Sequence, residues 1–431
     1  MFLAQEKFPI FLILENFTIT PLKLTMPSRL SSTAFQDLSL ILLAVALPWS
    51  LAAMQIALGL VVLAHFLDCR KQGSALIRWN RLYWPLGLYL GLRLLSVIFA
   101  PRPLYSLRAF WSTDWIVFLV PVLVSLRWGG RRLQRFLTVL LFSSALAGAY
   151  GVFQALSGLD WFGHAPLTPM GSFYRAIGGY NFYLTFAGNQ LLAFALGLGF
   201  FLLPESWPLP RGWLGAVLAI LFLSLLGTFA RSVWLAMAGL CLLALWLTRS
   251  RGLRRVLPAG ILLAAGLIWL VPELRLRLFS IFDPALNENR LNLWHTAWRM
   301  IKAHPFLGIG PGMFNEVFEQ YRVPGFYDAT GHAHNDYFNT ALNSGIPALL
   351  AWLAIWALWF YRGIHGWQSP DRTQLERAVL LGCLLGMAGI LIAAFFQCYY
   401  TDLENNIFWW LIYSLGAVAQ ARISAARPST A

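Results

Sequence analysis

Apolar stretches alternate with short polar connections along most of this chain. An α-helix needs about 20 apolar residues to cross the hydrocarbon core of a bilayer, and the chain repeatedly offers runs of about 18 or more. The pattern predicts an all-α fold with about twelve membrane spans. The predicted spans are Ala34–Pro48, Leu51–Leu67, Leu82–Phe99, Arg108–Leu126, Leu133–Ala155, Phe182–Leu203, Trp213–Gly227, Ser232–Leu247, Val256–Val271, Asp336–Tyr361, Leu375–Phe396 and Ile407–Ala419.

The spans divide the chain into segments of different character. The N-terminal extension lacks the basic lead and the small-residue cleavage site of a secretory signal, and either Met1 or Met26 is the expected start. Because the first two spans are short, Pro48-Trp49-Ser50 is either a kink in one long helix or a tight helical hairpin. The expected segments are an extension (1–33), a first transmembrane bundle (34–271), a long outward loop (272–335), C-terminal transmembrane helices (336–422) and a cytoplasmic tail (423–431).

Composition agrees with this pattern. Of the 431 residues, 58% are hydrophobic and 12% are charged, and 20 are Trp. A soluble domain of this length is less apolar, so we expect a polytopic helical membrane protein. The four cysteines are scattered along the chain, which argues against a disulfide framework.

Basic residues in the short connections indicate the orientation, because cytoplasmic loops carry an excess of Lys and Arg. They gather in the even-numbered connections, so both termini are expected in the cytoplasm and the odd connections outside. The net charge of +14 then follows from topology and attraction to anionic lipid head groups, without nucleic acid. These residues are Arg70, Lys71, Arg78, Arg81, Arg127, Arg131, Arg132, Arg135, Arg249, Arg251, Arg254, Arg255, Arg362, Arg372 and Arg377.

The expected outer side carries the two longest connections, 157–181 and 272–334. A connection as long as the second is usually functional. Within it, Asn289–His304 has apolar residues at helical spacing, which predicts an amphipathic helix on the membrane surface or over a cavity. Pro305–Gly312 is a Gly/Pro turn, and not a phosphate loop, because no strand precedes it and no Lys-Ser/Thr pair follows. The apolar residues of the helix are Leu291, Trp294, Trp298 and Ile301.

The long loop ends in a polar cluster beside a predicted span. His332, His334, Asn335 and Asp336 lie where that helix leaves the membrane. Histidine changes charge near neutral pH, and ionisable groups in a membrane helix are usually functional. The structural alternative is a capping histidine, with Asp336 favoured by the helix dipole. We expect proton chemistry on a polar substrate at this position.

Three features follow one another here: Arg290 with Trp294, the Pro305–Gly312 turn, and the His332–Asn335 segment. In this order they resemble the O-antigen ligase and polymerase superfamily of bacterial cell envelopes. The family's ligase motif is His, then Asn, Ser or Gln, nine residues, Gly, two residues, and Gly, Thr or Tyr.

The chain matches this motif at His334, Asn335 and Gly345, but Ala348 departs from its last position. The departure leaves ligase and polymerase open.

The resemblance implies both a substrate and residue roles. The donor would be a glycan linked to undecaprenyl pyrophosphate, transferred to an acceptor hydroxyl such as that of lipid A core at the periplasmic face of the bacterial inner membrane. His334 is implied as the general base of an inverting displacement. Arg175 and Arg231 are implied to bind the pyrophosphate, for which paired guanidinium donors are suited. The remaining expected substrate-binding residues are Arg290, His332, Asn335 and Asp336.

We expect neither a metal nor another cofactor. The first outward loop, 101–107, has no carboxylate, and His332 with His334 lacks a matching Cys/His set. Arg93 and Asp114 fall inside spans, where a buried ion pair is expected and an ion or proton path is the alternative.

Other functions stay open at this point. Within the superfamily, the chain is alternatively an O-antigen polymerase or a protein O-oligosaccharyltransferase. Outside glycosyl transfer, it is a solute carrier of the bicarbonate type or a noncatalytic partner in envelope assembly. A carrier is expected to show inverted repeats with interrupted helices, and no internal duplication is visible in the sequence.

Overall fold

The computed structural model describes residues 32–163, 166–248, 251–327 and 331–421. These residues are largely helical, as predicted, and their only strands are β1 (Pro169–Met170) and β2 (Phe173–Tyr174), which pair antiparallel. The helices are α1 (Ser32–Ala46), α2 (Leu51–Gln72), α3 (Tyr83–Ile98), α4 (Pro103–Ser125), α5 (Gly130–Ser157), α6 (Tyr183–Leu202), η1 (Pro204–Ser206), α7 (Arg211–Gly227), α8 (Arg231–Thr248), α9 (Arg251–Leu270), α10 (Pro272–Phe279), η2 (Ala285–Asn287), α11 (Glu288–Ala303), α12 (Phe314–Tyr321), α13 (Asp336–Gln368), α14 (Gln374–Ala393) and α15 (Leu403–Gln420).

Seven helices of the described residues are long and apolar enough to cross a bilayer, namely α2, α4, α5, α6, α8, α13 and α14. Shorter apolar helices are α1, α3, α7 and the Gly260–Leu270 part of α9. The chain is therefore a multi-pass membrane protein, while the count of twelve spans stays a prediction. The predicted extension at 1–33 and the tail at 423–431 lie almost wholly outside the described residues.

The first two spans form a helical hairpin. Between α1 and α2 the chain turns, and Ser50 caps α2 by accepting a hydrogen bond from the Ala53 N–H. Contacts with other parts of the chain hold the turn. The Trp49 indole donates to Ser143 of α5 at 3.0 Å, and the Tyr180 hydroxyl donates to the Leu47 carbonyl. This settles the choice between a kink and a hairpin.

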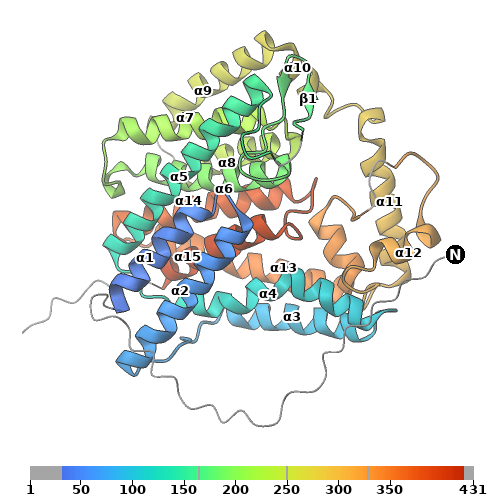
Figure 1. The fold of residues 1–431 in the computed structure, drawn as a ribbon, viewed down its shortest axis with the longest axis horizontal. Coiled ribbons are helices and arrows are strands. Elements are labelled where there is room, and N and C mark those ends of the chain that lie inside the picture. Colours follow the sequence, from blue (N-terminus) through green and yellow to red (C-terminus); the bar gives the residue numbers. More distant parts are fainter. Residues whose placement is uncertain (1–31, 164–165, 249–250, 328–330, 422–431) are drawn as a thin grey trace, which may run out of the picture.

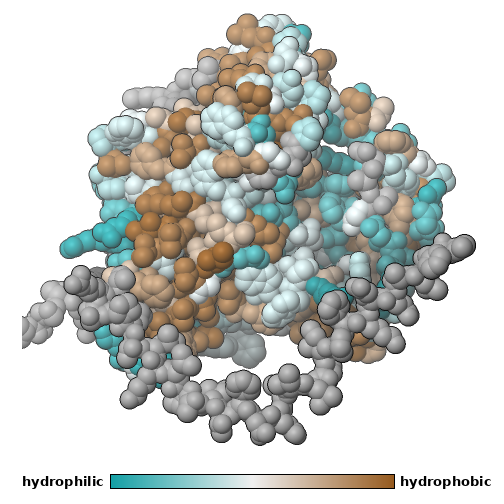
Figure 2. All heavy atoms as spheres, viewed as in Figure 1, coloured by the Kyte–Doolittle hydropathy of each residue, from teal (hydrophilic) through white to brown (hydrophobic). Residues whose placement is uncertain are grey.

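The centre of the bundle is formed by α6, α14 and α15 (Figure 1). Of the most apolar 18-residue stretch of α6, 94% is buried inside the protein, against 39% for α2 and α4 at the periphery. Figure 2 shows hydrophobic side chains over the face that carries α1 and α2. A membrane protein exposes apolar side chains to lipid, so this face is typical of a lipid-facing surface.

A buried ion pair joins α3 and α4. The Arg93 guanidinium lies 2.7 Å from the Asp114 carboxylate, and both side chains are buried. The Tyr400 hydroxyl donates to the second Asp114 oxygen at 2.8 Å, so the carboxylate is well satisfied. The predicted pair is confirmed, because a charge in a membrane interior needs such partners.

Helix α13 is broken at Gly345, which has φ +84° and ψ 167°. The break frees backbone groups of α13, and the Pro305–Gly312 turn docks onto them. The predicted turn thus also clamps the long loop 272–335 to the transmembrane bundle. Its backbone hydrogen bonds are Ile309 N–H to Leu342 O (2.7 Å), Gly310 N–H to Asn343 O (3.0 Å) and Ile346 N–H to Pro305 O (2.7 Å).

We expect Gly345→Ala to destabilise the protein by roughly 2–5 kcal/mol, because it adds backbone strain and a steric clash. An alanine Cβ at this position would lie 2.1 Å from the Phe306 carbonyl oxygen. The melting temperature of purified protein checks this. Gly331→Ala is the matched control, since nothing lies within 4 Å of a Cβ there. Equal melting temperatures for the two variants would contradict the proposed clamp.

Candidate functional site

The long loop between α9 and α13 folds into α10, η2, α11 and α12, with α10 at the top of Figure 1 and α11 and α12 on its right. The predicted amphipathic helix is present as α11. Its buried face is formed by Leu293, Ala297, Met300 and Ile301, which pack against α12 and the start of α13. Of the four apolar residues named for this helix, Ile301 is buried, Leu291 and Trp294 line the cavity described below, and Trp298 is 49% exposed.

His334 has an unusual backbone conformation. Its φ is +48°, and Phe229 is the only other non-glycine residue of the described ranges with positive φ. Such a conformation is costly for a side chain with a Cβ and is often found at functional sites. The His334 N–H donates to His332 Nδ1 at 3.2 Å, and the two rings pack edge to face at 4.3 Å.

The His334 ring is oriented by Gln397, a residue that the sequence analysis missed. His334 Nδ1 lies 2.5 Å from the Gln397 Oε1 atom, and Gln397 is only 5% exposed. An amide oxygen accepts hydrogen bonds and cannot donate them, so Nδ1 carries the proton. This tautomer leaves Nε2 as the nitrogen that accepts a proton.

His332 differs from His334 in its electrostatics. Burial lowers the pKa of His332 to about 4, and the neighbouring His334 contributes in the same direction. His332 is therefore neutral at pH 7 and adds no positive charge to the site. Its ring accepts a hydrogen bond from the backbone of His334, which indicates a supporting position.

Asn335 and Asp336 are both engaged by the protein. Asn335 caps α13, with its side-chain oxygen accepting from the Phe338 N–H at 3.0 Å. The buried Asp336 carboxylate accepts from the N–H groups of Tyr399 and Tyr400 at 2.9 and 3.1 Å. The Asp336 contacts tie the loop after α14 to the start of α13, and the Asn335 cap fixes the first turn of that helix. Together they fix the position of the His334 backbone.

Arg231 and Arg290 line a single cavity of about 280 Å³ between α8, α11 and the loop after α14. Figure 2 shows hydrophilic side chains in a hollow beside α11. Apolar and aromatic side chains complete the walls, as in many ligand sites. The other lining residues are Ser232, Leu235, Ile281, Phe282, Pro284, Asn287, Leu291, Trp294 and Phe396.

The two cavity arginines are held differently. Arg231 donates through Nη1 to the carbonyl of Ser280 at 2.6 Å and to its hydroxyl at 3.0 Å. Arg290 forms no hydrogen bond or ion pair within the described part of the chain. Burial, with a contribution from the positive charge of Arg175, lowers the pKa of Arg290. A bound anion would offset this cost.

Two further arginines belong to the same cluster. The Arg175 guanidinium lies over the Tyr183 ring, 4.1 Å from its centre. Arg277 was not predicted; it donates to the Phe229 carbonyl at 3.1 Å. Burial and the charges of Arg175 and Arg231 lower the pKa of Arg277 to about 10. None of the four arginines forms an ion pair with a carboxylate in the described ranges, so the cluster is strongly positive.

His334 adjoins this cavity through its neighbours. Phe396, which lines the cavity, directly precedes Gln397 in the chain, and Gln397 holds the His334 ring. Trp294, which also lines the cavity, lies 6.1 Å from Phe338 in the first turn of α13 and 6.4 Å from Phe396, measured between ring centres. His334 itself is not among the residues that line the cavity.

Among the described residues, no group of three or more His, Cys, Asp and Glu side chains is arranged to hold a metal ion. The positive charges of the site come from arginine.

These observations define a class of protein: a multi-pass helical membrane protein whose long loop between α9 and α13 lines an arginine-containing cavity near a histidine with positive φ. Residues 214–353, from α7 into α13, match the family described as O-antigen ligase, and this match supports the resemblance to the O-antigen ligase and polymerase superfamily. The match includes Arg231, Arg290 and His334, whereas Arg175 and Gln397 lie outside it. Comparison with curated proteins gives no match.

Proposed function

We propose that this protein transfers a glycan from undecaprenyl pyrophosphate to an acceptor hydroxyl at the periplasmic face of the bacterial inner membrane, as an O-antigen ligase does. The observation that carries the proposal is the pair Arg231 and Arg290, which share one cavity beside His334 without carboxylate partners. The family match supports it. In this proposal the loop at 272–335 is periplasmic and separates the bundle at 34–271 from the helices at 336–422.

The arginines bind the pyrophosphate of the donor. A guanidinium offers parallel N–H donors that fit phosphate oxygens, and it stays charged when buried. Arg290 is available for this contact, and Arg231 is held in place by Ser280. Arg175 adds positive charge nearby. Because the leaving group gains negative charge as its bond to the sugar breaks, these cations stabilise the transition state more than the ground state.

His334 acts as the general base. The acceptor oxygen attacks the anomeric carbon, the bond from that carbon to the phosphate oxygen breaks, and undecaprenyl pyrophosphate leaves. The acceptor proton moves to His334 Nε2, since Gln397 keeps the other nitrogen protonated. One displacement from the opposite face inverts the anomeric centre. Asn335, Asp336 and His332 contribute by positioning His334 and not by touching the donor.

The same site serves either a ligase or a polymerase. Ala348, which departs from the ligase motif, is fully buried in α13 and does not line the cavity. Its effect is therefore on helix packing, and it does not select the acceptor directly. A polymerase or a protein O-oligosaccharyltransferase remains the alternative to a ligase.

Reconstituted vesicles test the proposal. Protein supplied with lipid-linked donor and lipid A core should form a core-linked glycan, and donor alone should stay unchanged. Longer glycans on the carrier without core would identify a polymerase. Absence of transfer to every acceptor, together with uptake of a labelled solute in vesicles without donor, would contradict the proposal in favour of a carrier.

Substituting Gln397 tests its role in orienting His334. Gln397→Leu should reduce transfer about tenfold, since it removes one hydrogen bond worth roughly 1.4 kcal/mol. Gln397→Glu should keep transfer but move the acid limb of the pH–rate profile upward, because a carboxylate stabilises imidazolium and raises the pKa of His334. The pH–rate profiles of the variants check both. An unchanged profile for Gln397→Glu would contradict the contact.

A further inference from the structure

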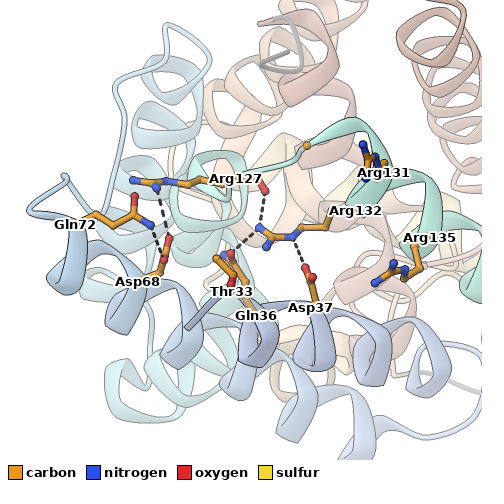
Figure 3. A pocket seen from close by; sticks show the side chains of 10 residues that line it. Thr33, Gln36, Asp37, Asp68, Gln72, Arg127, Arg131, Arg132 and Arg135 are labelled. Atoms are coloured by element: carbon orange, nitrogen blue, oxygen red, sulfur yellow. Dashed lines mark hydrogen bonds and ion pairs between the residues drawn. The ribbon is translucent and has the colours of Figure 1, made fainter. Parts of the chain in front are cut away.

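A second basic cavity lies at the far end of α5 from the arginine cluster. Its volume is about 430 Å³, and it is enclosed by the start of α1, the end of α2 and the start of α5 (Figure 3). The 28 residues of α5 span about 42 Å, so this cavity opens at the opposite membrane face. The charged residues that line it are Asp37, Asp68, Arg127, Arg131, Arg132 and Arg135.

Its charges are only partly compensated. Four arginines and two aspartates line the cavity, which leaves an excess of two positive charges. Arg132 pairs with Asp37, and Arg127 lies 3.8 Å from Asp68 (Figure 3). Arg131 and Arg135, the other two, are exposed and have no hydrogen bond or ion pair among the described residues.

The start of α5 adds to the positive potential. Its N-cap is Gly129, which provides no side-chain cap, and Arg131 follows in the first turn. The first N–H groups of a helix favour negative charge, so basic residues there oppose the helix dipole. A bound anion would be stabilised by the N–H groups and by the guanidinium groups together.

Gln36 is an independent sign of a missing partner. It lines the cavity, is 1% exposed, and its Nε2 group has no hydrogen-bond partner. Its oxygen accepts from Arg132 at 2.7 Å, which fixes the amide in the cavity wall. An unsatisfied buried amide N–H group costs free energy unless an acceptor is supplied.

The surroundings favour a lipid over a free ion. On α1, Leu38, Leu42 and Val45 are all more than 40% exposed, and they begin one residue after Asp37 of the cavity. Exposed apolar residues on a membrane helix face acyl chains. An anion bound between α1 and α5 therefore has hydrocarbon directly beside it. We propose that this cavity binds the phosphate head group of an anionic phospholipid.

Native mass spectrometry of the full-length protein with added dioleoyl phosphatidylglycerol or phosphatidylcholine tests this. The wild type should retain phosphatidylglycerol, and Arg131→Gln/Arg135→Gln should retain at least five times less. Arg131→Lys/Arg135→Lys should keep most of the binding. The matched control is Arg78→Gln/Arg81→Gln, which removes two exposed charges from the neighbouring α2–α3 connection outside the cavity. This control should bind as the wild type does.

Three results would overturn the proposal. They are equal retention by the Arg131→Gln/Arg135→Gln protein and the wild type, an equal loss in the control, and equal retention of phosphatidylcholine. Inorganic phosphate, added alone, separates the two sources of a phosphate group. Binding of inorganic phosphate through Arg131 and Arg135, without binding of phosphatidylglycerol, would overturn the assignment to a lipid. None of these measurements depends on glycan transfer.

Discussion

Replacing His334 with alanine should lower glycan transfer by roughly 10²–10⁴-fold, the usual contribution of a positioned general base. Binding of the lipid-linked donor should persist, because Arg231 and Arg290 remain in the cavity. The rate of transfer in reconstituted vesicles, measured alongside retention of labelled donor, separates the two steps. Alanine also removes the ring that Gln397 holds, but it leaves the α13 cap at Asn335 in place.

His295→Ala is the matched control for this substitution. His295 is an exposed histidine of α11 on the same loop, so its loss tests whether removing any imidazole there affects transfer. The control should keep the wild-type rate. A His334→Ala protein that transfers glycan as fast as the His295→Ala protein would rule out His334 as the base.

Removing the charge of Arg290 should have the second large effect. Arg290→Gln should weaken donor binding and lower transfer by about 10²–10³-fold, as expected for the loss of charge-assisted bonds to a leaving group. The melting temperature should not fall, because the guanidinium has no partner in the described residues, and burial and the charge of Arg175 already lower its pKa. Donor binding, transfer rate and melting temperature measured together distinguish this outcome from misfolding.

Two further variants sharpen the test of Arg290. Arg290→Lys should recover only part of the activity, since an ammonium group lacks the paired donors of a guanidinium. Arg299→Gln, on an exposed part of the same helix, should leave donor binding unchanged. Full activity in the Arg290→Gln protein would show that the donor phosphates bind elsewhere.

The sequence predicted the helices because membrane spans are marked by long apolar runs, and every predicted span overlaps one observed helix. Helix starts were less predictable. We expected the fourth span to begin at Arg108, whereas α4 begins at Pro103, a residue favoured in the first helical position. The preference of proline for the first helical position was visible in the sequence and was not used.

The missed parts of the site depend on contacts between distant residues. Gln397 follows His334 by 63 positions, and nothing local to Phe396-Gln397-Cys398 indicates a partner for an imidazole. Arg277 lies in a short basic helix that is typical of a solvent-exposed loop. Only the fold brings it near Arg175 and Arg231. Sequence reasoning singled out the arginines that the family resemblance marks, and it passed over Arg277, which the resemblance does not mark.

The most direct test of the account is a structure with the lipid-linked donor bound. We expect the pyrophosphate between the guanidinium groups of Arg231 and Arg290, with the anomeric carbon on the side of the cavity formed by Phe396, next to Gln397 and His334. A donor whose phosphates lie away from both arginines, or whose sugar points away from His334, would contradict it.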